Sequence, residues 1–110
     1  MITLDEEMEF VERWPGLWVR VPRHDETKFN VRECKYGPGR VFKAHPHDTD
    51  QISYIKEGKI RVMVGDEERV VGAGGYYYTP AGAPHHIKEV LEPTIEILIG
   101  LAPPETNTGS

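Results

Sequence analysis

The sequence predicts a single all-β domain. Its 110 residues are enough for one compact core and too few for a second domain. Short alternating runs rich in β-branched residues are separated at close intervals by Gly, Pro and Asp, which favour turns. About eight or nine short strands at this spacing indicate a sandwich or a barrel and not βαβ units.

The N-terminal part is the only region where helix is expected. Residues 5–13 are expected to form at most a turn or two, which the Trp-Pro-Gly run at 14–16 would end. The first strands are expected at 18–21 and 31–36, where apolar and polar residues alternate.

The second half of the chain carries the clearest strand patterns. Apolar residues occupy every second position in 60–64, and the Gly-Asp-Glu run at 65–67 predicts a hairpin turn. The turn leads into a strand at 69–71. A last strand is expected at 94–99, where every second residue is isoleucine.

Three regions are expected along the chain. An N-terminal segment with the first strand or strands covers 1–22, a β-barrel covers 23–101, and 102–110 forms a loosely ordered tail. The edges of so small a β domain must be paired or covered. Aromatic residues around Trp14 and Trp18 and at 76–78 could supply a partner surface, so a homodimer is expected.

Composition and charge exclude several kinds of partner. The formal net charge is −5 and no basic run exists to neutralise phosphates, so nucleic-acid binding is not expected. No apolar stretch is long enough to cross a bilayer, and the N-terminus lacks a secretory signal, so no membrane partner is expected. The single cysteine, Cys34, fits a reducing cytoplasm and is expected to be a buried, inert thiol.

Three histidines and a glutamine form two separated clusters. His45 and His47 stand two residues apart in a stretch that otherwise has a strand pattern, so both side chains leave the same face. Such a pair with a distant third histidine, His85, is a common metal site, because neutral imidazole suits Zn, Cu, Fe and Ni. Gln51 lies near enough to add an oxygen donor.

These clusters resemble the two motifs of the cupin family. The first motif runs Gly, five residues, His-x-His, three or four residues, Glu, six residues, Gly. Its positions here are Gly39, His45, His47 and Gly58, with Gln51 where the family usually has Glu. The second runs Gly, five residues, Pro-x-Gly, two residues, His, three residues, Asn. Its positions are Gly74, Pro80, Gly82 and His85, with Glu89 where Asn is expected.

The resemblance implies a double-stranded β-helix (jelly roll) barrel of the cupin type. One divalent transition metal ion (Zn, Mn, Fe or Ni) would sit inside, bound by His45, His47, Gln51 and His85. Many single-domain cupins are homodimers, which agrees with the edge argument. His86 is expected to point outward because neighbours on a strand alternate, although a one-residue slip would exchange it with His85.

The amide at Gln51 bears on the reaction. A neutral ligand leaves the metal its full charge and makes it a stronger Lewis acid. Cupins with three histidines and Gln, such as those acting on unsaturated uronates and some polyketide cyclases, look like non-redox enzymes, whereas quercetin and acireductone dioxygenases usually keep Glu. We therefore interpret the chain as a metal-dependent lyase, isomerase or cyclase acting on a small carboxylate or sugar derivative. The alternatives are a metal-dependent dioxygenase and a non-catalytic protein that binds a metal or small ligand.

Candidates for proton transfer are Glu89, Tyr76, Tyr78 and Glu96. Alternation from the third histidine places Glu89 on the inward face. At least one of Tyr76 and Tyr78 is expected to line the barrel mouth. Glu96 could stand for the final-strand acid of the uronate-processing cupins. Those cupins also carry an arginine just after this acid, whereas this chain has no Lys or Arg after Lys88.

Overall fold

The chain folds into one antiparallel sheet of seven strands, which confirms the predicted all-β class. The computed structural model describes residues 2–22, 28–40, 42 and 47–101. A short 3-10 helix, η1 (Asp5–Glu7), precedes the strands. The strands are β1 (Val11–Trp14), β2 (Leu17–Arg20), β3 (Phe29–Tyr36), β4 (Gln51–Val64), β5 (Glu67–Gly72), β6 (Tyr76–Thr79) and β7 (His85–Leu101). No helix in this described part of the chain is long and apolar enough to cross a membrane.

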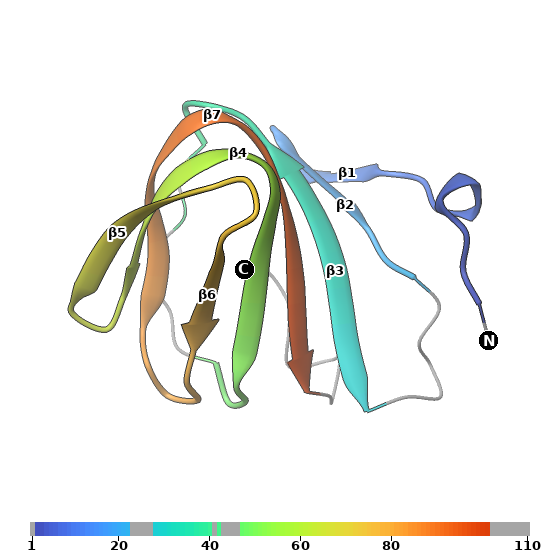
Figure 1. Cartoon of the computed structure of the whole chain (residues 1–110). Helices are drawn as coiled ribbons and strands as arrows, with labels where there is room; N and C mark the ends of the chain where they lie inside the picture. The colour runs from blue at the N-terminus through green and yellow to red at the C-terminus, as the bar shows by residue number, and fades with distance from the viewer. Residues whose placement is uncertain (1, 23–27, 41, 43–46, 102–110) are drawn as a thin grey trace.

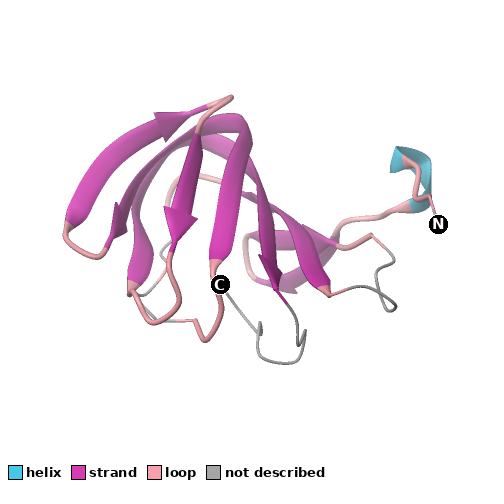
Figure 2. Ribbon diagram, turned by 60° about the horizontal axis from the view of Figure 1, so that its bottom comes forward, coloured by secondary structure: helices cyan, strands magenta, loops and turns pink. Residues whose placement is uncertain are grey.

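Two long strands, β4 and β7, build the frame of the sheet. They have 14 and 17 residues and pair from Gln51 opposite Gly100 to Val64 opposite His85. Figure 1 shows both strands bending together, so that the sheet forms an arch with two arms. The first half of β4 and the second half of β7 form one arm with β3 and β6, and the other halves form the second arm with β5. Figure 2 shows the same curvature from another side.

The bend depends on irregular pairing and on one glycine. The register between β4 and β7 shifts repeatedly between Ile55 and Ile60. Gly58 lies at this point with φ +94°, in the left-handed region that glycine favours. A Cβ atom there would lie 2.3 Å from Pro93 O and 2.4 Å from Thr94 Oγ1. Glycine therefore lets β4 pass close to β7 at the top of the arch.

The inner face of the arch contains the hydrophobic core. Ile55 and Ile60, on either side of the bend, are fully buried. The other buried apolar residues are Leu17, Val19, Cys34, Tyr36, Phe42, Val62, Ile87, Val90 and Leu98. Burial of each large aliphatic side chain stabilises the fold by about 1.5–3 kcal/mol. The core thus holds the two arms together.

The N-terminal segment differs from its prediction. The helix expected at 5–13 is limited to η1, and Val11–Trp14 forms a strand. Pairing of β1 with β2 outweighs the weak helical preference of so short a segment. The hairpin turn predicted at 65–67 is confirmed between β4 and β5. The described residues form seven strands, fewer than expected, because β4 and β7 each run without interruption. The predicted tail at 102–110 lies outside the described residues.

Replacing Gly58 by alanine is expected to destabilise the protein strongly, because the new Cβ would overlap Pro93 and Thr94. Gly74→Ala is the matched control, since Gly74 has φ +90° but no atom within 4 Å of its Cβ position. In urea denaturation, we expect Gly74→Ala to lower the free energy of unfolding by about 1–2 kcal/mol and Gly58→Ala by about 3 kcal/mol or more. Equal losses of unfolding free energy in the two variants would show that the close approach of β4 to β7 does not require glycine at position 58.

Candidate metal centre

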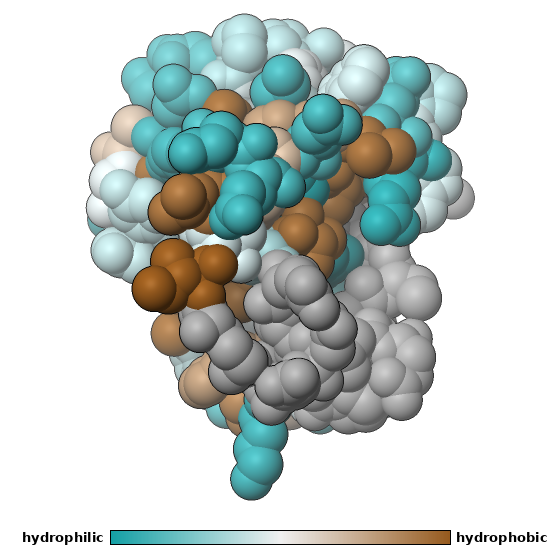
Figure 3. Space-filling model, turned by 90° about the vertical axis from the view of Figure 1, so that its right-hand side faces the viewer, coloured by the Kyte–Doolittle hydropathy of each residue, from teal (hydrophilic) through white to brown (hydrophobic). Residues whose placement is uncertain are grey.

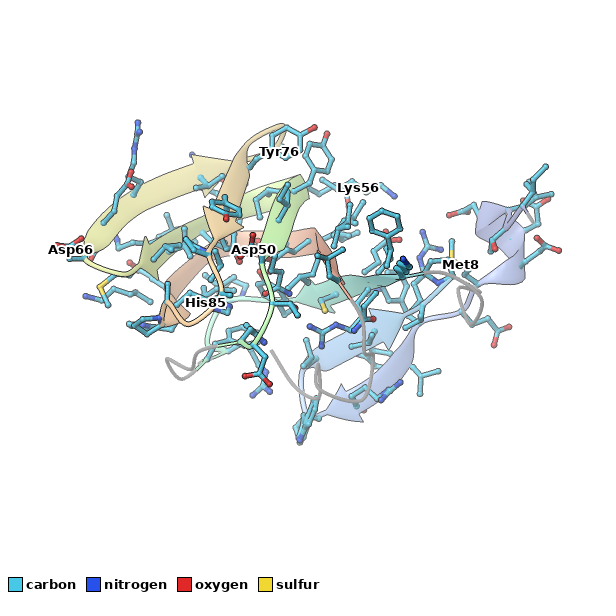
Figure 4. All side chains as sticks on the ribbon, turned by 90° about the horizontal axis from the view of Figure 1, so that it is seen from below. Met8, Asp50, Lys56, Asp66, Tyr76 and His85 are labelled. Atoms are coloured by element: carbon cyan, nitrogen blue, oxygen red, sulfur yellow. The ribbon has the colours of Figure 1, made fainter. Side chains whose placement is uncertain are left out.

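Three of the four predicted metal ligands lie at the open end of the arch. His47 precedes β4, Gln51 is the first residue of β4, and His85 is the first residue of β7. All three are buried, and the rings of His47 and His85 stack with centroids 4.9 Å apart. Figure 4 looks into this end and labels His85 and Asp50. His45, the fourth predicted ligand, lies outside the described residues.

Two hydrogen bonds connect the segments that carry these ligands. The N–H of Gly82 donates to the carbonyl oxygen of His47 over 2.8 Å. The N–H of Ala81 donates to Asp50 Oδ1, also over 2.8 Å. The turn before β7 is thereby attached to the segment before β4. This attachment explains how His47 and His85, far apart in sequence, come to stack.

The side chain of Gln51 fits a metal ligand. It is 4% exposed, and its Oε1 is buried without a hydrogen-bond partner among the described residues. An unsatisfied buried acceptor costs about 1–3 kcal/mol, which a bound cation would offset. Imidazole nitrogens with an amide oxygen suit divalent first-row ions. Within the described ranges no three His, Cys, Asp or Glu side chains form a metal cluster, so the ligand set depends on Gln51 and His45.

A buried carboxylate lies deeper inside the arch. Glu96 is 2% exposed and accepts hydrogen bonds from the Tyr36 hydroxyl (2.6 Å, to Oε1) and from the Tyr77 hydroxyl (to Oε2). Burial, followed by the negative charge of Glu96, raises the pKa of both tyrosines well above the usual value. Both phenols therefore remain donors at neutral pH and fix the orientation of the carboxylate.

A small cavity lies between this carboxylate and the open end. Its volume of about 20 Å³ has room for about one water molecule. The residues that line it include Tyr36, Phe42, Tyr77, His85, His86 and Glu96. A predicted metal ligand and a buried carboxylate therefore border one common space.

The prediction that Glu89 faces inward is wrong. Glu89 is exposed, and its Oε1 lies 3.6 Å from Arg61 Nε. The register between β4 and β7 shifts between Arg61 and Val62. This irregularity reverses the alternation counted from His85 and turns Glu89 outward.

Tyr76 and Tyr78, predicted to line the barrel mouth, border an open hollow of about 670 Å³ that is lined by β4, β5 and β6. These side chains are 67% and 53% exposed, whereas Tyr77 between them reaches Glu96. Figure 4 shows Tyr76 on the outer side, near Lys56. Alternation separates the two faces of this strand, but it does not tell which face is buried. The sequence does not single out Tyr36 either, and its only signal is the strand face that it shares with Cys34.

The two adjacent histidines both contribute to the interior. His85 is 4% exposed and faces inward, as predicted. His86 is half-buried and also lines the cavity. It is therefore not the purely outward residue that alternation predicts.

Comparison with known proteins agrees with this architecture. The family profile described as a cupin domain matches residues 32–95. An uncharacterized protein of Streptomyces coelicolor is 31% identical over 81 residues, which cover 74% of this chain and 76% of that protein. An RmlC-like cupin from Shewanella frigidimarina gives a TM-score of 0.83 at 21% identity, over 94% of this chain and 92% of that chain. KdgF from Halomonas sp. gives 0.78 at 20% identity, over 93% and 94%.

Metalloenzymes occur among the solved structures with this fold. The Fe(II) form of HppE gives a TM-score of 0.75 at 12% identity, over 92% of this chain and 60% of that chain. At identities this low, the similar structures show the fold alone. These structures confirm the predicted jelly roll.

Cys34 is a buried free thiol, and burial, with a smaller contribution from Glu96, raises its pKa to about 12. We expect native protein near pH 8 to resist thiol reagents and the unfolded chain to react. Since the unfolded chain loses this proton near pH 9, the free energy of unfolding should fall by up to about 1.4 kcal/mol per pH unit between about pH 9 and 12. Cys34→Ala should show a smaller slope in denaturation curves. Rapid labelling of native protein near pH 8, or an unchanged slope, would contradict this assignment.

Proposed function

This chain belongs to the cupin family, and we propose that it is a metal-dependent enzyme acting on a small oxygenated metabolite. The observation that carries the proposal is the buried, unsatisfied Oε1 of Gln51, at the same end of the arch as two buried histidines. A neutral amide leaves a divalent ion its full charge, which favours Lewis-acid over redox chemistry. The reaction class is therefore that of a lyase, isomerase or cyclase, with a carboxylate or sugar derivative as substrate.

The residues proposed to hold the ion are His45, His47, Gln51 and His85. When bound, a divalent transition metal would polarise a substrate oxygen and so stabilise negative charge on it. The protein positions the ligands and excludes water from the site. The hydrogen bonds of the Gly82 and Ala81 N–H groups attach the two ligand segments to each other. Apolar residues of the second arm, such as Val62 and Ile87, exclude water and so strengthen electrostatic interactions at the site.

Glu96 is the group that we assign to proton transfer. It borders the same cavity as His85, and a carboxylate has acceptor positions beyond the two that the tyrosine hydroxyls occupy. Tyr36 and Tyr77 hold its orientation, which favours proton transfer, directly or through one water molecule in the cavity, to or from a small substrate at the open end. The carboxylate thus acts as the acid or base while the tyrosines position it.

Protein purified without added metal or chelator is expected to carry about one transition-metal ion per chain in elemental analysis. His47→Ala and His85→Ala should each lose most of the metal, and Gln51→Ala should weaken binding by about tenfold or more. His86→Ala removes the adjacent imidazole and is the matched control, which should retain the ion. Full metal content in a His47→Ala/His85→Ala double variant, or no uptake by the wild type on titration, would refute the site.

Glu96→Gln preserves side-chain size but removes the acid–base group. With a substrate found in a panel of small hydroxy acids, keto acids and sugar acids, we expect kcat to fall about 10²–10⁴-fold with metal content unchanged. Glu89→Gln, on the outer face, should retain activity. Turnover should continue without oxygen. An oxygen requirement would identify a dioxygenase instead, and binding of panel compounds without turnover would identify a non-catalytic protein.

The homodimer expected from the sequence is proposed to form through the outer face of the arm that contains β3, β7, β4 and β6. Cross-strand pairing aligns four outward apolar residues in one row: Val31, Ile99, Ile52 and Tyr78. Phe29, Leu101 and Tyr76 beside this row are also exposed. Figure 3, viewed from the side of β3 and the N-terminal segment, shows apolar side chains exposed between hydrophilic ones.

The area and charges of this face fit a second copy of the chain. Its exposed apolar side chains present on the order of 600 Å², at the upper limit for a monomer and close to the ~800 Å² that each partner buries in a standard interface. Two such faces can pack as sheet on sheet. Asp50, immediately before β4, and Lys56 of β4 lie at opposite ends of the outward residues in this segment. A two-fold axis between them would bring each lysine near the other copy's aspartate.

Light scattering after gel filtration is expected to give twice the chain mass of 12.5 kDa. Ile52→Asp, which places a charge at the centre of the apolar row, should give a monomer. Val70→Asp is the matched control, because Val70 is 45% exposed on β5 in the other arm. A monomeric wild type at about 100 μM, or a dimer unaffected by Ile52→Asp, would overturn the assigned interface.

A cytoplasmic location is part of the proposal. Cys34 is a buried free thiol, and the chain has no second cysteine with which it could form an internal disulfide. Free thiols of this kind are typical of reducing compartments.

A further inference from the structure

One arginine lies on the inner face of the arch. Arg32 of β3 pairs with Leu98 of β7, Leu98 pairs with Ser53 of β4, and Ser53 pairs with Tyr77 of β6. Residues paired in this way share one face of a sheet. Leu98 and Ser53 are buried and Tyr77 lines the cavity, so this face is the interior one. The buried Nη2 of Arg32 agrees with that placement.

No described carboxylate forms an ion pair with the Arg32 guanidinium, although the charge of Glu96 acts on it from farther away. The Nη2 of Arg32 has no hydrogen-bond partner among the described residues. Glu96 lies diagonally opposite, with about 7–8 Å expected between the Cα atoms, but its oxygens accept from two tyrosines instead. Arg20, in contrast, pairs with Glu33 (2.9 Å) and Asp5 (2.8 Å). An inward cation left without an anion marks a place for an anionic ligand.

Arg32 also lies between the two groups assigned to the reaction. Arg32 belongs to one row of paired residues across the sheet. Gln51 lies in the next inward-facing row toward the open end, and Glu96 lies in the next such row toward the bend. Strand spacing puts the Cα atoms of Arg32 and Gln51 roughly 12 Å apart. An arginine side chain and a small molecule can together span that distance.

We propose that Arg32 binds a carboxylate of the substrate and makes small carboxylates the substrate class of this site. This inference rests on the proposed function. A guanidinium presents parallel N–H donors that match a carboxylate in a bidentate arrangement. If Arg32 holds the carboxylate, the rest of the substrate lies between Gln51 and Glu96. A substrate oxygen can then face Gln51, and a carbon-bound proton can face Glu96.

The test compares propionate with propionamide, which have the same shape but differ in charge, on protein as purified. We expect propionate to shift the Arg32 guanidinium resonance in NMR titrations. Propionamide should bind at least about tenfold more weakly than propionate. Arg32→Gln should reduce propionate binding to the level of propionamide, and Arg32→Lys should restore part of it. Arg61→Gln, at an arginine outside the arch interior, should bind propionate like the wild type.

Equal binding of the two probes, or undiminished propionate binding in Arg32→Gln, would overturn the proposal. Binding of inorganic phosphate in preference to propionate would overturn the carboxylate class. If Arg32→Gln does not fold, the probe pair and the guanidinium resonance of the wild type decide the question. Elemental analysis separates this inference from the proposed function: a metal-loaded wild type that ignores propionate refutes only the role of Arg32. A metal-free protein with Arg32-dependent binding refutes only the metal enzyme.

Discussion

The bent pairing of β4 with β7 determines where the residues of the candidate site lie. Gln51 lies near one end of this ladder and His85 at the other, and the bend brings both ends to the same side of the molecule. The bend in turn requires the close approach at Gly58, where a Cβ atom would overlap Pro93 and Thr94. A backbone feature at the top of the arch therefore positions the side chains at its open end. Loop hydrogen bonds then fix His47 against His85.

The buried polar groups inside the arch differ in whether the protein itself satisfies their hydrogen bonds. Glu96, although almost fully buried, has both oxygens occupied by tyrosine hydroxyls, so its burial is compensated. Gln51 Oε1 and Arg32 Nη2 are buried without such compensation among the described residues. One is an acceptor suited to a cation and the other a donor suited to an anion. Their positions in neighbouring rows of one inner face agree with the proposed site for a metal ion and an anionic substrate.

Much of this arrangement could be predicted from the sequence, for physical reasons that also explain the failures. Motif spacing predicts that His47, Gln51 and His85 lie close together, and all three are buried at the open end of the arch. Strand alternation alone places Glu89 on the wrong face, because a local pattern does not reveal the register shift in β7. Alternation does not single out Tyr77 or Arg32, because their roles depend on residues of other strands. Residues 5–13 form less helix than expected because Val11–Trp14 pairs with β2, and local helix propensity does not include such pairing.

We propose that Gln51 completes a metal site with the three motif histidines. Anomalous diffraction from crystals of protein purified without added metal, recorded at the absorption edge of the ion that elemental analysis identifies, tests it most directly. We expect one anomalous peak per chain, with nitrogens of His45, His47 and His85 and Oε1 of Gln51 at about 2.0–2.3 Å. Absence of the peak, or a Gln51 amide turned away into a hydrogen bond with the protein, would refute this ligand set.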